Sequence, residues 1–151
     1  MALLTTFGVG CVLAVEETDS RFEFVGVPVR QGGMKGCLVG PDGQGGEALY
    51  FNFNQLSGKL FLVQVDPETG ASRQFDAPDG PGAWAFRLGP DERIYLGTWD
   101  GALILRFDPA KTEEGIVVVG KPAPTESYIW QYTIGHDGWI YGGTYPEARL
   151  V

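Results

Sequence analysis

The chain resembles itself at a spacing of 46 residues, and this internal similarity constrains its fold more than any other feature. Shifting the sequence by 46 residues lays Ala83–Leu105 on Ile129–Val151 without a gap, and eight of the 23 aligned positions are identical. An earlier copy precedes both, since Gly40 begins a Gly-Pro-Asp turn 49 residues before the one at Gly89. Such a period indicates structural units that bury their apolar faces against one another.

Each unit has the pattern of a β-hairpin. Gly89-Pro90-Asp91 is a turn, because proline fixes φ and the aspartate can accept hydrogen bonds from nearby amides. The β-prone segment Arg93–Leu96 follows, and Thr98–Gly101 forms a second turn. The apolar run Ala102–Phe107 then ends before a proline, which stops a β-ladder. The units are therefore expected to build antiparallel sheet.

Applying this pattern to the whole chain predicts eleven strands and almost no helix. They are Lys35–Val39, Ala48–Phe53, Lys59–Val65, Ser72–Phe75, Ala83–Leu88, Arg93–Gly97, Ala102–Phe107, Gly115–Val119, Ile129–Ile134, Trp139–Gly142 and Ala148–Val151. Phe22–Val29 is a further candidate for an outer strand.

A period in the mid-forties, with four short strands per unit, is typical of β-propeller blades. The sequence therefore predicts an all-β chain with a partial β-propeller over residues 21–151 and blades at about 34–80, 81–127 and 128–151. Residues 1–20 are interpreted as a leader or an incomplete strand. The last blade stops within its third strand, so about two and a half four-stranded blades are visible. We expect them to be the N-terminal part of a longer ring, and the alternative is a ring assembled from several copies of the chain.

The repeated motif also resembles a group of known families. The pattern G-P-D-x-x-I-Y-x-G-T at Gly89–Thr98 is followed by an apolar run that ends in R-F-D-P at Arg106–Pro109. This combination is similar to blades of streptogramin lyases, gluconolactonase and senescence-marker proteins, and NHL-repeat proteins. The resemblance covers roughly residues 34–151 and implies a propeller. It does not select one family, and a fold alone does not determine a function.

Composition excludes some classes of function. The formal net charge is −8 and the isoelectric point is near 4.5, whereas a nucleic-acid surface needs a basic stripe. Nucleic acid is therefore not an expected partner. Glycine at 23 of 151 positions suits a chain rich in turns.

The first residues allow two interpretations. Ala2–Val15 is an apolar run of 14 residues, which suits the central part of an export signal and is too short to span a bilayer. However, no lysine or arginine occurs before Arg21, so a strand from an incomplete start is equally consistent. An extracytoplasmic location follows only from the first interpretation. The two cysteines do not suggest a disulfide framework, and Cys37 is expected to be a small buried hydrophobic residue.

Candidate catalytic residues are few. His136 is the one histidine, and its neighbour Asp137 makes a metal or acid–base role conceivable. His136 replaces the turn prolines at 41 and 90, so we expect an exposed turn residue instead. No Ser/His/Asp set, Cys/His cluster, Walker loop or dinucleotide-binding glycine motif is present, and the catalytic and metal-binding residues stay unassigned.

The propeller resemblance implies a ligand site where the loops after the second strands and between blades converge. The ligand-binding candidates in these loops are Trp99, Asp100, Tyr128, Tyr145 and Glu147, and Asn52 and Asn54 lie in the corresponding loop of the first unit. Aromatic rings beside carboxylates can stack on a sugar and hydrogen-bond its hydroxyls. By contrast, Trp84 and Trp130 repeat at identical positions and are expected to pack between blades. Like Tyr95 and Tyr141, they are expected to occupy equivalent and largely buried sites.

Two functions follow as expectations. One is a repeat module that binds a small molecule, a carbohydrate or a protein at this face. The alternative is a lyase or hydrolase of the streptogramin-lyase or lactonase type, for which the family resemblance implies a divalent cation.

Overall fold

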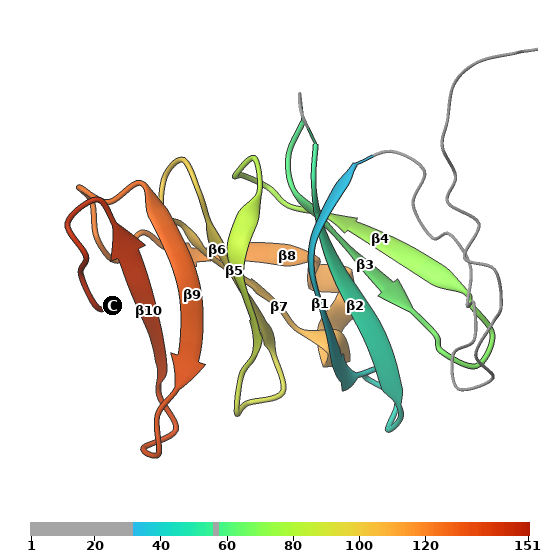
Figure 1. The fold of residues 1–151 in the computed structure, drawn as a ribbon. Coiled ribbons are helices and arrows are strands. Elements are labelled where there is room, and N and C mark those ends of the chain that lie inside the picture. The colour runs from blue at the N-terminus through green and yellow to red at the C-terminus, as the bar shows by residue number, and fades with distance from the viewer. Residues whose placement is uncertain (1–31, 56–57) are drawn as a thin grey trace, which may run out of the picture.

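A computed structural model describes residues 32–55 and 58–151, which are mostly β-strand (Figure 1). The strands are β1 (Gly33–Pro41), β2 (Glu47–Asn54), β3 (Phe61–Val65), β4 (Ser72–Asp76), β5 (Ala83–Leu88), β6 (Ile94–Thr98), β7 (Ile104–Phe107), β8 (Ile116–Gly120), β9 (Tyr128–Ile134) and β10 (Ile140–Tyr145). One 3-10 helix, η1 (Pro109–Glu114), separates β7 from β8.

Ten of the eleven predicted strands are confirmed, with bounds that differ by three residues or fewer. The prediction for Ala148–Val151 is wrong, because this segment contributes only an isolated bridge between Leu150 and Gly143. The proposed leader at 1–20 and the strand candidate Phe22–Val29 lie outside the described residues.

The predicted β-propeller is wrong. The described residues form three separate antiparallel sheets with the orders β1-β2-β3-β4, β5-β6-β7-β8 and β10-β9, and no closed ring is formed. The sheets lie side by side in Figure 1, where β5 packs against β1, and β9 packs against β5 and β6. The 46-residue similarity reflects the strands and turns within each unit, which are determined by residues close together in the sequence. How the units are arranged relative to one another depends on contacts between distant segments, which this local pattern does not encode.

Aromatic rings fill the core between the first two sheets. Phe107 is fully buried, with its ring centroid 4.5 Å from that of Phe75 and 6.0 Å from that of Tyr50. The third sheet joins the second through Ile129, which is also fully buried. A side chain at Gly97 would place its Cβ 2.7 Å from Ile129, so glycine is needed there for the two sheets to approach.

The turns that begin the second and third sheets use matching contacts. Tyr95 donates a hydrogen bond to Asp91 Oδ2 at 2.9 Å, and Tyr141 donates one to Asp137 Oδ2 at 2.6 Å. A Cβ at the glycine two residues before each aspartate would lie 2.8 Å from the tyrosine ring. Both tyrosines are therefore in equivalent environments, as expected, but they are half-buried rather than buried. His136 is exposed in the second of these turns, which confirms its assignment as a turn residue.

Cys37 corrects a further expectation, because its side chain is exposed on β1. The burial pattern of β1 alternates only in its second half, and Cys37 lies on the side that faces away from the core. An apolar stretch of sequence does not by itself show which face of a strand is covered.

Asp108 links the second sheet to η1. Its Oδ1 accepts a hydrogen bond from Ala110 N at 3.0 Å and caps the helix, in which Pro109 occupies the first turn. Its Oδ2 accepts a hydrogen bond from Arg93 Nε at 2.9 Å. Burial alone would raise the pKa of Asp108, but the hydrogen bonds from Arg93 and Ala110 outweigh it and lower that pKa.

Replacing this carboxylate should therefore destabilise the fold in a pH-dependent way. Asp108→Ala is expected to lower the free energy of unfolding at neutral pH by about 1–2 kcal/mol. A depressed pKa contributes stability above the unfolded value, about 3.9, and this contribution is lost as the pH falls through the folded value. Urea denaturation at neutral and acidic pH should show that the difference in the free energy of unfolding between Asp108→Ala and the parent protein becomes smaller in acid. A difference in the free energy of unfolding that does not change with pH would contradict this role. Asp76→Ala, which replaces an exposed aspartate, is the control.

Candidate functional site

The first strand of each sheet contains a β-bulge at a corresponding place. The strand register skips Lys35 between Met34 and Gly36 in β1, and it skips Trp84 in β5 and Trp130 in β9. An inserted residue of this kind has no partner on the neighbouring strand, and the bulge re-aims its side chain. β1, β5 and β9 all begin at the end of the sheets drawn uppermost in Figure 1. The bulges therefore place three side chains at one end of the protein.

These three side chains meet there. Lys35 Nζ lies 4.8 Å from the centroid of the Trp84 ring, and the centroids of Trp84 and Trp130 are 5.9 Å apart. One bulge residue from each sheet thus contributes to a continuous row.

Neighbouring loop and strand ends extend the row. The Trp99 ring lies 5.0 Å from Trp84, and the Tyr128 ring lies 5.6 Å from Trp130. Tyr145 completes it at 5.5 Å from Tyr128. We call Trp84, Trp99, Tyr128, Trp130 and Tyr145 the aromatic band.

Three members of the aromatic band, Trp84, Trp130 and Tyr145, are exposed, and Trp99 and Tyr128 are partly buried. This corrects the expectation that Trp84 and Trp130 are buried. Trp84 is 43% exposed and Trp130 is 49% exposed. In β5 the buried positions are Ala83 and Ala85, on either side of the bulge residue Trp84. In β9 the buried neighbour of Trp130 is Ile129. The repetition of tryptophan at positions 84 and 130 indicated that the two residues occupy equivalent places in their sheets. It did not indicate that these places are buried.

Trp99 is held against a glycine. Trp99 N donates a hydrogen bond to Gly82 O at 3.2 Å, and a Cβ at Gly82 would lie 2.0 Å from the Trp99 ring. Any larger residue at 82 would displace the indole. The small residue therefore fixes where this ring lies in the aromatic band.

Backbone hydrogen bonds join the loops that carry Trp99 and Tyr145. Gly101 N and Ala102 N both donate to Ser127 O, and Ser127 N donates to Tyr145 O at 2.8 Å. Asp100 has a positive φ of 57°, a conformation that a non-glycine residue adopts only when its surroundings impose it. The backbone of Ser127 therefore joins the two loops.

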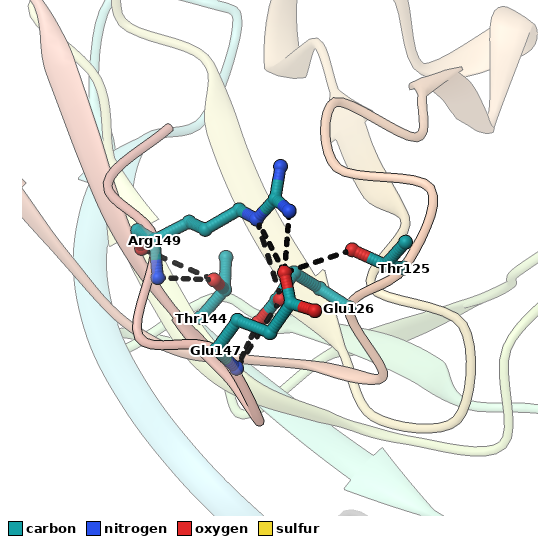
Figure 2. A network of polar contacts seen from close by, with 5 residues as sticks. All are labelled: Thr125, Glu126, Thr144, Glu147 and Arg149. Atoms are coloured by element: carbon teal, nitrogen blue, oxygen red, sulfur yellow. Dashed lines mark hydrogen bonds and ion pairs between the residues drawn. The ribbon is translucent and has the colours of Figure 1, made fainter.

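A polar network joins the loop before β9 to the end of β10 and the residues that follow it (Figure 2). The Glu126 side chain is fully buried, and its Oε2 accepts a hydrogen bond from Glu147 N at 3.2 Å. Arg149 Nε lies 3.7 Å from Glu126 Oε1 and 2.9 Å from Glu147 Oε2. Thr125 donates to the same Glu147 carboxylate, and Thr144 exchanges hydrogen bonds with the backbone of Arg149.

The structure brings three of the five sequence-derived candidates together, namely Trp99, Tyr128 and Tyr145. Asp100 is exposed next to Trp99. Glu147 is exposed but is engaged by Arg149, and this hydrogen bond lowers the pKa of the Glu147 carboxyl. The Glu147 side chain therefore mainly contacts other residues of the protein.

The two asparagines of the first unit do not join the exposed band. Asn52 is fully buried and its Nδ2 donates to Ala83 O at 3.4 Å, and Asn54 is partly buried. The sequence-based candidates instead missed Lys35, Trp84 and Trp130. The signal for the two tryptophans was the pairing of aromatic residues at 84 and 130 and again at 99 and 145, in both cases at a shift of 46 residues, and no sequence signal pointed to Lys35.

The described residues were also compared with the requirements of a metal site and of a membrane-spanning helix. Within residues 32–55 and 58–151, no three histidine, cysteine, aspartate or glutamate side chains gather closely enough to hold a metal ion. No helix of the described residues combines the length and apolar character needed to cross a membrane.

Comparison of the chain with family models, curated proteins and solved structures finds no match. The resemblance to streptogramin-lyase, gluconolactonase and NHL-repeat proteins therefore stays a prediction from the sequence motif.

Enlarging Gly82 should displace the Trp99 ring. Gly82→Ala is expected to change the near-ultraviolet circular dichroism of the indoles and to lower the free energy of unfolding by about 1–3 kcal/mol, because the added methyl overlaps the ring. Gly120→Ala is the matched control, since a Cβ at that glycine meets no atom within 4 Å. An unchanged indole spectrum in Gly82→Ala would show that Trp99 is not held in this position.

Removing the cation from the polar network should destabilise the protein. Arg149→Met is expected to lower the free energy of unfolding by about 1–3 kcal/mol, because Glu126 then keeps a buried charge with fewer partners. Adding Glu126→Gln should recover part of this loss, since the neutral amide carries no buried charge. Chemical denaturation of the single and double variants, with Lys121→Met at an exposed lysine as control, measures both effects. A double variant less stable than Arg149→Met alone would contradict the coupling.

Proposed function

We propose that this protein is a carbohydrate-binding module and that the aromatic band is its binding surface. The proposal depends mainly on one observation, the three matching β-bulges at Lys35, Trp84 and Trp130. Exposed indoles gain little stability for the fold, whereas bulges are common where a side chain must be re-aimed for function. The arrangement is therefore better explained by a ligand than by packing.

The chemistry of the aromatic band suits a sugar. An exposed indole or phenol presents a flat apolar face on which the C–H face of a pyranose can stack, and its polar edge remains hydrated. Asp100 is exposed beside these rings, where its carboxylate could accept hydrogen bonds from sugar hydroxyls. This combination of stacking faces and flanking polar groups is typical of saccharide recognition.

The continuity of the aromatic band favours an extended ligand. Neighbouring ring centroids are 5.0–6.3 Å apart from Trp99 to Tyr145, and the row passes from the second sheet to the third. A single sugar would cover one or two rings, whereas an oligosaccharide could contact the whole row. A chain of several sugars is therefore the expected ligand.

The other functions predicted from the sequence remain open predictions. A small-molecule or protein ligand is compatible with the same exposed rings. A lyase or hydrolase activity has no described residue set that supports it, and the carbohydrate proposal does not depend on it.

Oligosaccharide binding to single-site variants tests the proposal. Trp130→Ala is expected to weaken binding by roughly 5- to 30-fold, which corresponds to a loss of about 1–2 kcal/mol from a stacked ring. Isothermal titration with cello-, xylo- and chito-oligosaccharides measures the dissociation constants.

Trp139→Ala is the matched control. Trp139 is 71% exposed, but it follows the turn at Asp137 between β9 and β10, at the opposite end of these strands from Tyr128 and Tyr145. Its replacement should leave the affinity unchanged. Equal losses in Trp130→Ala and Trp139→Ala, or no binding of any oligosaccharide, would refute the proposal.

A further inference from the structure

The aromatic band already holds an ammonium group. Lys35 Nζ lies 4.8 Å from the centroid of the Trp84 ring and 5.8 Å from that of the Trp99 ring. The two indole centroids are 5.0 Å apart and their planes are inclined by 42°. Two tryptophan rings, one on β5 and one in the loop after β6, therefore receive one cation from the first sheet.

This contact is physically favourable but easily replaced. Tryptophan is the aromatic side chain with the strongest attraction for a cation, and an exposed pair is worth about 0.5–1 kcal/mol. Lys35 is exposed at a bulge, so its side chain can leave the rings and become hydrated. A second cation could take its place at a small cost.

The overall charge of the protein favours cationic ligands. With a formal net charge of −8, the protein attracts positively charged molecules and repels polyanions. An acidic saccharide would have to approach against this field, whereas a saccharide with protonated amino groups would be drawn toward it. Both the contact at Lys35 and the overall charge of the protein thus favour a positively charged ligand.

We propose that Trp84 and Trp99 form an ammonium-binding subsite and that the ligand of the aromatic band is a saccharide with free, protonated amino groups. The Lys35 ammonium occupies this subsite in the free protein and is displaced when the ligand binds. The inference rests on the proposed carbohydrate-binding function and specifies its ligand class. Stacking on Trp130, Tyr128 and Tyr145 would hold the rest of the saccharide.

A pair of probes separates charge from stacking. A glucosamine oligomer, at an acidic pH that protonates its amines, and its N-acetylated counterpart of equal length share the same sugar rings but differ in charge. Isothermal titration with both probes is carried out on the parent protein, Lys35→Met and Lys35→Arg. Methionine keeps an unbranched side chain without the cation, whereas arginine keeps a cation that also stacks on tryptophan.

The glucosamine oligomer should bind the parent protein more tightly than the N-acetylated oligomer. Lys35→Met should raise the affinity for the glucosamine oligomer by roughly 2- to 5-fold, because the ligand no longer displaces an internal cation worth about 0.5–1 kcal/mol. Lys35→Arg should not raise it. Neither substitution should change the affinity for the N-acetylated oligomer by a similar factor.

Three results would overturn the inference. Equal binding of both oligomers, unchanged by Lys35→Met, would leave the carbohydrate surface intact but show that no ammonium subsite exists. Weaker binding of the glucosamine oligomer to Lys35→Met would show that Lys35 contacts the ligand directly. Failure of both oligomers to bind any of the proteins would refute the carbohydrate proposal and the inference together.

Discussion

The β-bulges in β1, β5 and β9 are the constraint on which the exposed end of this protein depends. In a regular strand, each side chain alternates between the two faces and has a partner opposite it. The bulge residue has no such partner, so its side chain can point toward the end of the sheet without breaking the ladder on either side. Because the three bulges occur at matching places, Lys35, Trp84 and Trp130 come within ring-contact distance across three separate sheets.

The surroundings of the aromatic band keep its rings in place. Gly82 leaves room for the Trp99 indole, and Ser127 fastens the loops after Trp99 and at Tyr145 to each other. The buried carboxylate of Glu126 holds the backbone of the following loop at Glu147. Ordered rings lose less conformational entropy when they bind a ligand than mobile ones, so this support favours affinity.

The sequence predicted the strands well because their limits are encoded locally. Glycine, proline and aspartate at the turns have conformations and hydrogen bonds that depend on a few neighbouring residues, as the Asp91–Tyr95 and Asp137–Tyr141 contacts illustrate. The arrangement of the sheets was predicted wrongly, because it depends on packing between distant segments such as Gly97 and Ile129. The exposure of Trp84 and Trp130 was also missed, since a bulge changes the strand register without leaving a distinct residue pattern. The loop positions in the sequence nevertheless predicted that Trp99, Tyr128 and Tyr145 lie near one another, and the structure places them in one row through Trp84 and Trp130.

Three of the four tryptophans are proposed to form one ligand surface, and Trp139 lies apart from it. A ¹⁵N-labelled sample gives a separate indole N–H signal for each tryptophan, and these signals can be followed by NMR while an oligosaccharide is added. The signals of Trp84, Trp99 and Trp130 should shift together with one dissociation constant, while that of Trp139 stays in place. A shift of Trp139 alone, or shifts of the three that follow different dissociation constants, would contradict a single aromatic binding surface.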